Sequence, residues 1–313
     1  MAGLDESRLG LASEVGLAAD AFLDEIPVDR LDPAGTITPS SRRLCAGLGL
    51  LGQATYRALG GTRRGDEVGL AGAMLSLLTK LDDQVIDARD FHAGTSREAA
   101  AEKTRAYLAP TLASIRSGAP ASDDERCVFA ARLGRRLRAL GSCEHVIETI
   151  ARGWEVQAIA VSTLTRHASE VTLAEVESVT RDISGVWLLM ITEIGTIGTR
   201  ALTREESDAF QLWGDAIQKA DALNDLTKDI ADGHWSTYPL KVLFERSSRD
   251  YERARAGADV DVLLAKNGVA EVCFDPGLVQ RAASAHAGLG DVQLLLRWIH
   301  EHLTARWHAR RGG

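Results

Sequence analysis

Three aspartates recur at intervals of four residues in the segment QKADALNDLTKDIADG, residues 218–233, as Asp221, Asp225 and Asp229. Four residues make slightly more than one helical turn and the segment has no proline and no internal glycine, so their carboxylates should share one stripe of a helix. Each pair of like charges costs an isolated helix about 0.2–0.5 kcal/mol, and the cost rises where the stripe faces a low-dielectric interior. Such a stripe is tolerable in an interior only if something offsets the repulsion between its carboxylates.

A second acidic segment, LLTKLDDQVIDARD at residues 77–90, repeats the spacing with Asp83 and Asp87 and places Asp82 beside them. A lone Asp-x-x-x-Asp is more often a solvated helix face, but two copies, each attached to an apolar stretch, favour two walls of one buried cleft. Buried carboxylates are usually paired with a cation, and oxygen ligands suit a hard one. Magnesium prefers few carboxylates, several waters and phosphate oxygens. The two segments therefore predict a magnesium site that holds a diphosphate.

Composition excludes several other classes of function. The 313 residues carry a formal charge of −8 and no basic run longer than three residues, so nucleic acid is not an expected partner. Four widely separated cysteines form no CxxC pair and are expected to be reduced thiols.

The first residues lack the basic and apolar regions of a signal peptide. The most apolar later segment, residues 183–198, is interrupted by Glu193 and is too short to span a bilayer. We expect no transmembrane helix and a cytoplasmic location.

Long Ala- and Leu-rich windows with apolar residues at helical spacing dominate the chain, and strand-like alternation is scarce. They predict helices near residues 40–61, 65–91, 97–116, 123–140, 143–166, 172–199, 204–232, 239–255 and 277–308. The segments between them are too short to separate two domains. We expect a single all-α domain over residues 1–313, a bundle of about nine or ten helices, with disorder near residues 1–6 and 309–313.

Residues 213–233, WGDAIQKADALNDLTKDIADG, resemble the second aspartate-rich helix of the squalene/phytoene synthase family. The positions at matching spacing are Gly214, Ala216, Gln218, Asp225, Asp229 and Gly233, and Asp221 stands where the family usually has asparagine. DQVID, residues 83–87, is similar to the first aspartate-rich motif of that family. DISGVWLLM, residues 182–190, resembles its small-residue helix segment, with Gly185 at the matched glycine.

The resemblance implies an isoprenoid synthase fold, a helical bundle with a central apolar cavity. In that family two aspartate-rich helices bind Mg²⁺, which neutralises the pyrophosphate leaving an allylic substrate. The substrate it implies is a C15 or C20 prenyl diphosphate. By this matching, Asp83, Asp87, Asp225 and Asp229 are the catalytic metal ligands, with Asp82 and Asp221 as additions.

Basic side chains should assist the departure of pyrophosphate, although each could equally be an ordinary surface charge. The candidates nearest in sequence to the motifs are Lys80, Arg89, Arg181 and Lys228. The isoprenoid chain needs an apolar wall, and the residues expected to form a substrate pocket are Trp154, Gly185, Trp187 and Gln218.

The chain also departs from the family pattern. Two basic residues that usually follow the second motif are replaced by Ala231 and Asp232, another is replaced by His234, and Gln157 stands where the family usually has aspartate. Tyrosines expected before the small-residue segment are absent. These departures weigh against head-to-head coupling of two prenyl diphosphates but leave the first ionisation in place.

A terpene cyclase that converts one prenyl diphosphate to a cyclic product is therefore an alternative. Its metal motif would use Asn224, Lys228 and Asp232, but a lysine in place of serine or threonine repels a metal, so the register of Asp225 and Asp229 is preferred. A non-catalytic helical scaffold is a lesser alternative. Residues 294–311 form an amphipathic segment that we expect to dock on the protein body rather than contact a membrane surface, and a homodimer stays open.

Overall fold

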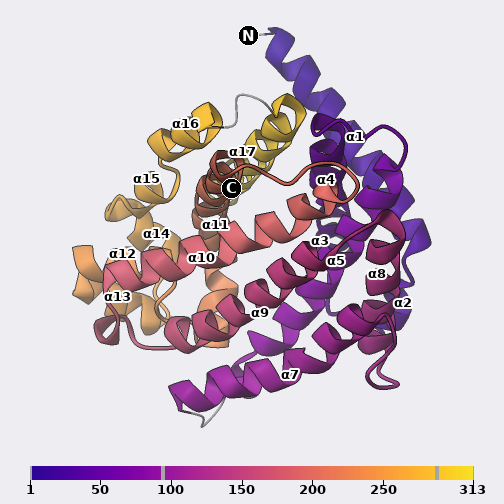
Figure 1. Cartoon of the computed structure of the whole chain (residues 1–313). Coiled ribbons are helices and arrows are strands. Elements are labelled where there is room, and N and C mark those ends of the chain that lie inside the picture. Colours follow the sequence, from indigo (N-terminus) through magenta and orange to yellow (C-terminus); the bar gives the residue numbers. More distant parts are fainter. Residues whose placement is uncertain (1, 93–95, 286–288, 313) are drawn as a thin grey trace.

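The protein is built from helices that stack around one another (Figure 1). The computed structural model describes residues 2–92, 96–285 and 289–312. In these residues every regular element is an α-helix or a short 3₁₀-helix, which confirms the all-α prediction. Helical backbone extends from Ala2 and to Gly312, and the expectation of disorder near residues 1–6 and 309–313 stays a prediction.

The helices follow one another with short connections. Their bounds are α1 (Ala2–Glu25), α2 (Val28–Leu31), α3 (Pro39–Gly47), α4 (Gly49–Ala58), α5 (Gly65–Ile86), α6 (Arg89–His92), α7 (Arg97–Ser117), α8 (Glu125–Leu140), α9 (Glu144–Leu164), η1 (Ala168–Glu170), α10 (Leu173–Thr192), η2 (Glu193–Thr196), α11 (Arg204–Asp232), α12 (Tyr238–Arg246), α13 (Ser248–Arg255), α14 (Val260–Lys266), α15 (Val269–Cys273), α16 (Pro276–Ala285) and α17 (Gly290–Gly312).

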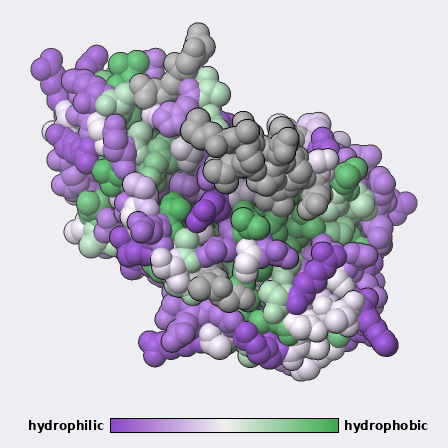
Figure 2. Space-filling view, turned by 90° about the horizontal axis from the view of Figure 1, so that it is seen from above, coloured by the Kyte–Doolittle hydropathy of each residue, from purple (hydrophilic) through white to green (hydrophobic). Residues whose placement is uncertain are grey.

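Helix α10 lies between α9 and α11, and α5 packs on α3 and α4 (Figure 1). Helix α17 packs on α11 and α4, so the basic amphipathic segment docks on the protein body as expected. Leu75, Leu77 and Leu78 of α5 are almost fully buried, which anchors the helix one turn before its acidic end. Figure 2 shows hydrophilic side chains around most of the outer rim of the face seen from above, with hydrophobic residues between them.

Both ends of α11 are set by capping residues. The hydroxyl of Thr203 accepts from the N–H of Glu206, whose carboxylate accepts from the N–H of Thr203, forming a capping box. At the other end Gly233 has φ 85°, the left-handed conformation that favours glycine. These two signals explain why α11 coincides with the predicted window 204–232.

Close approach between α10 and α11 depends on Gly214. A Cβ added there would lie 2.6 Å from the carbonyl carbon and oxygen of Ser184, well inside van der Waals contact. The two helices can therefore run against one another only because position 214 carries no side chain. This contact fixes the distance between α10 and α11 and thereby the position of the acidic end of α11.

Some helix boundaries differ from the prediction. The helix predicted over residues 65–91 ends at Ile86. The helix predicted over residues 239–255 is two helices, α12 and α13, which meet at Ser247, and the hydroxyl of Ser247 caps α13. Helices α1, α2, α14 and α15 were not predicted, and the described residues contain more α-helices than the nine or ten expected. Among the described residues, no helix combines the length and apolarity that crossing a bilayer would require.

Candidate active site

A cavity of about 530 Å³ lies between α3, α5, α9, α10, α11 and α17. Its size falls within the usual range for small-molecule sites. The predicted site residues that line it are Lys80, Asp82, Asp83, Asp87, Trp154, Trp187, Gln218, Asp221, Asp225, Lys228 and Asp229. Two segments far apart in sequence thus contribute to one cavity, as the two aspartate motifs predicted.

The aspartates form two rows that face each other. Lys80 of α5 interacts electrostatically with Asp83 of its own helix and with Asp225 of α11. Asp229 of α11 is in turn repelled by Asp87 at the end of α5. Because each row acts on charges of the other, the carboxylates converge on a shared space instead of pointing to separate surfaces.

Mutual repulsion and burial disfavour the charged form of these carboxylates. Burial, then repulsion from Asp87, raises the pKa of Asp83 to about 7. Burial, then repulsion from Asp225, raises the pKa of Asp221 to about 7 and that of Asp229 well above its ordinary value. A divalent cation between the rows would reverse this effect, because it favours the ionised carboxylates.

Lys80 supplies part of the missing positive charge. Burial opposes its charged form, but attraction to Asp83 and Asp225 outweighs burial and raises the pKa of the ammonium group. Lys228 has an ion pair of its own, because its Nζ lies 2.8 Å from Oδ2 of Asp232. Both lysines line the cavity, and each interacts electrostatically with carboxylates of both rows.

The rows fit magnesium by their chemistry. Their donors are all carboxylate oxygens, which suit a hard cation. Within the described part of the chain, no three His, Cys, Asp or Glu side chains gather closely enough to hold an ion unaided.

One carboxylate oxygen of Asp82 already forms an ion pair within the protein. Its Oδ1 lies 2.9 Å from Nη1 of Arg126, and the Arg126 guanidinium stacks 3.9 Å from the ring centroid of Tyr107. Only 2% of the Asp82 side chain is exposed. The sequence suggested Asp82 as an additional metal ligand, but in the structure it anchors α5 to α8.

Two predicted residues among the described side chains do not line the cavity. Arg181 is exposed on α10 and is not part of the cavity wall, which argues against its predicted contact with the diphosphate. Gly185 is buried, but a Cβ added there would meet Gln211 of α11, so this glycine serves helix packing and not the substrate pocket. The side chain of Arg89 lies outside the described residues.

The alternative cyclase register is not supported by the direction of Asn224. Its Nδ2 donates to the carbonyls of Ala220 and Leu303, both at 3.0 Å, so the amide faces α17 and not the cavity. Lys228 and Asp232, the other members of that register, pair with each other. The geometry favours the register of Asp225 and Asp229.

The remainder of the cavity is mostly apolar. Trp154, Trp187, Met190 and Ile217 are among the side chains that form it, supplied by α9, α10 and α11. An aliphatic chain buried there would gain about 25 cal/mol for each Å² of apolar surface removed from water. The cavity therefore combines a cluster of carboxylates with a mostly apolar remaining wall.

Helix α17 contributes a wall that sequence reasoning missed. Trp298, His302 and Arg306 recur every four residues and all line the cavity. The rings of Trp298 and His302 stack with centroids 5.5 Å apart, and Arg306 attracts the Asp221 carboxylate of α11. The four-residue spacing was the available signal, but it does not reveal which element the stripe faces.

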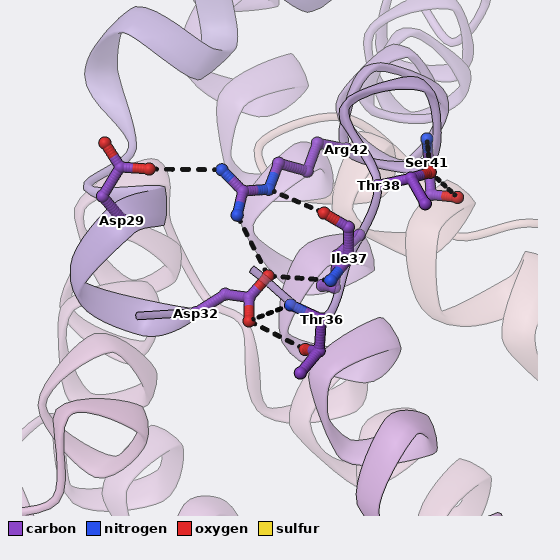
Figure 3. A network of polar contacts seen from close by, with 7 residues as sticks. All are labelled: Asp29, Asp32, Thr36, Ile37, Thr38, Ser41 and Arg42. Atoms are coloured by element: carbon purple, nitrogen blue, oxygen red, sulfur yellow. Dashed lines mark hydrogen bonds and ion pairs between the residues drawn. The ribbon is translucent and has the colours of Figure 1, made fainter. Parts of the chain in front are cut away.

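A loop before α3 forms another part of the wall, and a buried carboxylate holds it (Figure 3). Asp32 accepts from the N–H and hydroxyl of Thr36 at 2.8 and 2.7 Å, and from the N–H of Ile37 at 2.8 Å. Nη2 of Arg42 completes the set at 3.0 Å. Thr36 and Ile37 line the cavity, so Asp32 fixes the shape of its rim.

Comparisons with known proteins bear on the fold. No protein-family model matches the chain, and a search of curated proteins found no match. Among solved structures, geranylgeranyl pyrophosphate synthetase from Pyrococcus horikoshii Ot3 is similar, with a TM-score of 0.55 and 15% sequence identity. The likeness covers 96% of this chain and 99% of that one. The chain thus has the helical fold of an isoprenoid synthase.

Proposed function

We propose that the protein is a magnesium-dependent class I isoprenoid synthase, similar to squalene/phytoene synthases, that ionises a C15 or C20 prenyl diphosphate and releases pyrophosphate. The observation that carries this proposal is the pair of facing aspartate rows, with Lys80 between them, in a cavity whose remaining wall is mostly apolar. An anion held beside the carboxylates and a hydrocarbon held against the apolar wall match the two parts of such a substrate.

Asp83, Asp87, Asp225 and Asp229 would hold Mg²⁺, which supplies positive charge to the departing pyrophosphate when bound. Lys80 donates hydrogen bonds to phosphate oxygens from between the rows. The carbon–oxygen bond of the substrate breaks with both electrons on the pyrophosphate, leaving an allylic cation. The apolar walls exclude water and orient the chain, so that the cation meets only the intended partner.

We infer a coupled or prenyl-transferred product, with cyclisation of a single substrate as the second candidate. Coupling requires cationic groups for two diphosphates. In this chain Asp232 replaces a basic residue of the resembled family. It also forms an ion pair with Lys228, which offsets the charge of that lysine. This observation favours the second candidate, because it lowers the positive charge available to a second anion.

Product analysis tests the proposal. Purified protein is incubated with geranyl, farnesyl or geranylgeranyl diphosphate and Mg²⁺, and both released pyrophosphate and the organic extract are measured. A product with twice the carbon number of the substrate indicates coupling, and an equal number indicates cyclisation or elimination. Absence of pyrophosphate release from all three substrates would refute the enzyme assignment in favour of a helical scaffold.

A further inference from the structure

The connection between α11 and α12 places two unpartnered polar atoms in the cavity. They are Nε2 of His234 and Oγ1 of Thr237, and each side chain belongs to a residue that is only 5% exposed. A buried polar atom without a hydrogen-bond partner is destabilising. Two such groups three residues apart, facing the same cavity, point to a ligand that accepts hydrogen bonds from both.

The backbone turn at Gly233 aims His234 toward the aspartate rows. The N–H of His234 donates to the carbonyl of Asp229 at 2.8 Å, and the N–H of Gly233 donates to Ile230 at 3.2 Å. These two bonds form a Schellman motif, which folds the chain back over the last turn of α11. The imidazole accordingly interacts electrostatically with Asp87 of the opposite row.

Thr237 precedes α12 but does not cap it. The hydroxyls of Thr38, Thr172 and Thr203 each accept from the N–H three residues later, whereas that of Thr237 caps no N–H of its helix. Its hydroxyl is therefore free to serve a ligand in the cavity. The N-terminus of α12, a helix of nine residues, adds a partial positive charge at the same place.

We propose that His234 Nε2 and Thr237 Oγ1, at the N-terminus of α12, form an anion subsite for a phosphoryl group of the diphosphate held by the aspartate rows. This inference rests on the proposed function and extends it. Carboxylates can hold phosphate oxygens only through a cation, whereas an imidazole N–H and a hydroxyl donate to them directly. The subsite thus supplies donors that the aspartate rows lack.

Binding of inorganic pyrophosphate with saturating Mg²⁺, measured by titration calorimetry on the full chain, tests the subsite. His234→Phe and Thr237→Val remove the donors while keeping the side-chain volume close to the original. Each should weaken pyrophosphate binding about tenfold to a hundredfold, as expected for a hydrogen bond to a charged group. His234→Gln and Thr237→Ser restore a donor and should recover most of the affinity.

Two matched controls separate this effect from general destabilisation. His300 is buried with an unpartnered Nε2, and Thr111 is buried with an unpartnered Oγ1, but neither lines the cavity. His300→Phe and Thr111→Val should bind pyrophosphate like the wild type. Circular dichroism establishes that every variant is folded before its affinity is compared.

The outcomes are distinct. Wild-type affinity in both His234→Phe and Thr237→Val, or equal weakening in the two controls, overturns the subsite. A wild type that binds magnesium pyrophosphate but forms no product from any prenyl diphosphate refutes the proposed function and leaves the subsite standing. A wild type that fails to bind magnesium pyrophosphate overturns both.

Discussion

Arg126 of α8 donates from Nη1 to Oδ1 of Asp82 over 2.9 Å, and this buried ion pair ties the helix of the first aspartate row to its neighbour. Removing one partner of a buried pair usually costs about 3–5 kcal/mol. Burial already raises the pKa of Asp82 to about 7, so the carboxyl left behind can take up a proton and limit the loss. We expect Arg126→Met to lower the free energy of unfolding by about 3 kcal/mol in urea denaturation.

Arg132→Met is the control for Arg126→Met, because Arg132 is an exposed residue of the same helix. It should change stability by less than about 0.5 kcal/mol.

If Asp82 stabilises the position of α5 and does not bind a metal, the Asp82→Asn variant should keep far more turnover than the Asp83→Asn variant. Equal loss of turnover in the two variants would restore Asp82 to the metal ligands.

Asp83→Asn and Asp229→Asn should separate stability from activity. Each removes a partly buried carboxylate that its neighbours repel, so the protein without metal should be at least as stable as the wild type. Turnover should nevertheless fall by orders of magnitude. Thermal unfolding without Mg²⁺ and pyrophosphate release with Mg²⁺ measure the two effects, and Asp123→Asn, at an exposed position, should change neither.

Magnesium and pyrophosphate together should raise the melting temperature of the wild type. A ligand at about 100 times its dissociation constant adds about 2.7 kcal/mol to the stability of the state that binds it. Asp225→Asn should lose most of this gain, because it removes a predicted metal ligand from the cavity. A melting temperature that rises equally in the wild type and in Asp225→Asn would contradict the ligand assignment.

Asp32 predicts a specific loss of stability in acid. Burial alone would raise its pKa, but hydrogen bonds from Ile37, Thr36 and Arg42 lower it to about 2 from the ordinary value of 3.8. A carboxylate with a lowered folded pKa stabilises the protein above its unfolded pKa and loses that contribution as the pH falls through the folded one. The wild type should therefore lose about 2 kcal/mol through this group between about pH 4 and pH 2.

The predicted loss of stability in acid is tested by measuring the free energy of unfolding at a series of pH values. Asp32→Asn should be less stable at neutral pH and should show a shallower decline in acid than the wild type. Asp29→Asn is the matched control, because Asp29 contacts the same Arg42 at 3.2 Å with a side chain that is 99% exposed. An acid decline as steep in Asp32→Asn as in the wild type would mean that protonation of this carboxylate is not its cause.

Substitution by alanine should destabilise the protein to different extents at the two glycines of the α10–α11 contact. At Gly214 the new methyl would meet backbone atoms of Ser184 at 2.6 Å, so Gly214→Ala should cost about 3 kcal/mol. At Gly185 it would meet Gln211 at 3.1 Å or more, and the gain in helix propensity offsets part of the crowding. Gly185→Ala should stay within about 1 kcal/mol of the wild type in urea denaturation.

Gly290→Ala is the reference for these variants, because nothing lies within 4 Å of an added Cβ at that position of α17. It should leave stability unchanged or slightly higher. A Gly214→Ala variant as stable as Gly290→Ala would mean that α10 and α11 lie farther apart at this point than the backbone contact requires.

The sequence predicted α11 and the convergence of the two aspartate rows well, because those features depend on local signals. Thr203 and Gly233 mark the helix ends, and the four-residue spacing places the acids on one stripe. Arg181 and Gly185 were predicted less well for a physical reason. Sequence position places them on α10 but does not indicate which face of that helix looks into the cavity.

The wall supplied by α17 could not be predicted either. Its stripe of Trp298, His302 and Arg306 was visible as a pattern, but a pattern identifies a helix face and not the element it meets. The same holds for His234 and Thr237, whose unpartnered atoms appear only when every nearby donor and acceptor has been placed. Tertiary packing, and not local preference, decides these positions.

The ammonium group of Lys80 between the rows has a consequence for biosynthesis. The acids that the chain brings together on folding are therefore partly offset by a positive charge of its own. A newly made chain without this lysine should be more dependent on a bound cation for the same charge balance.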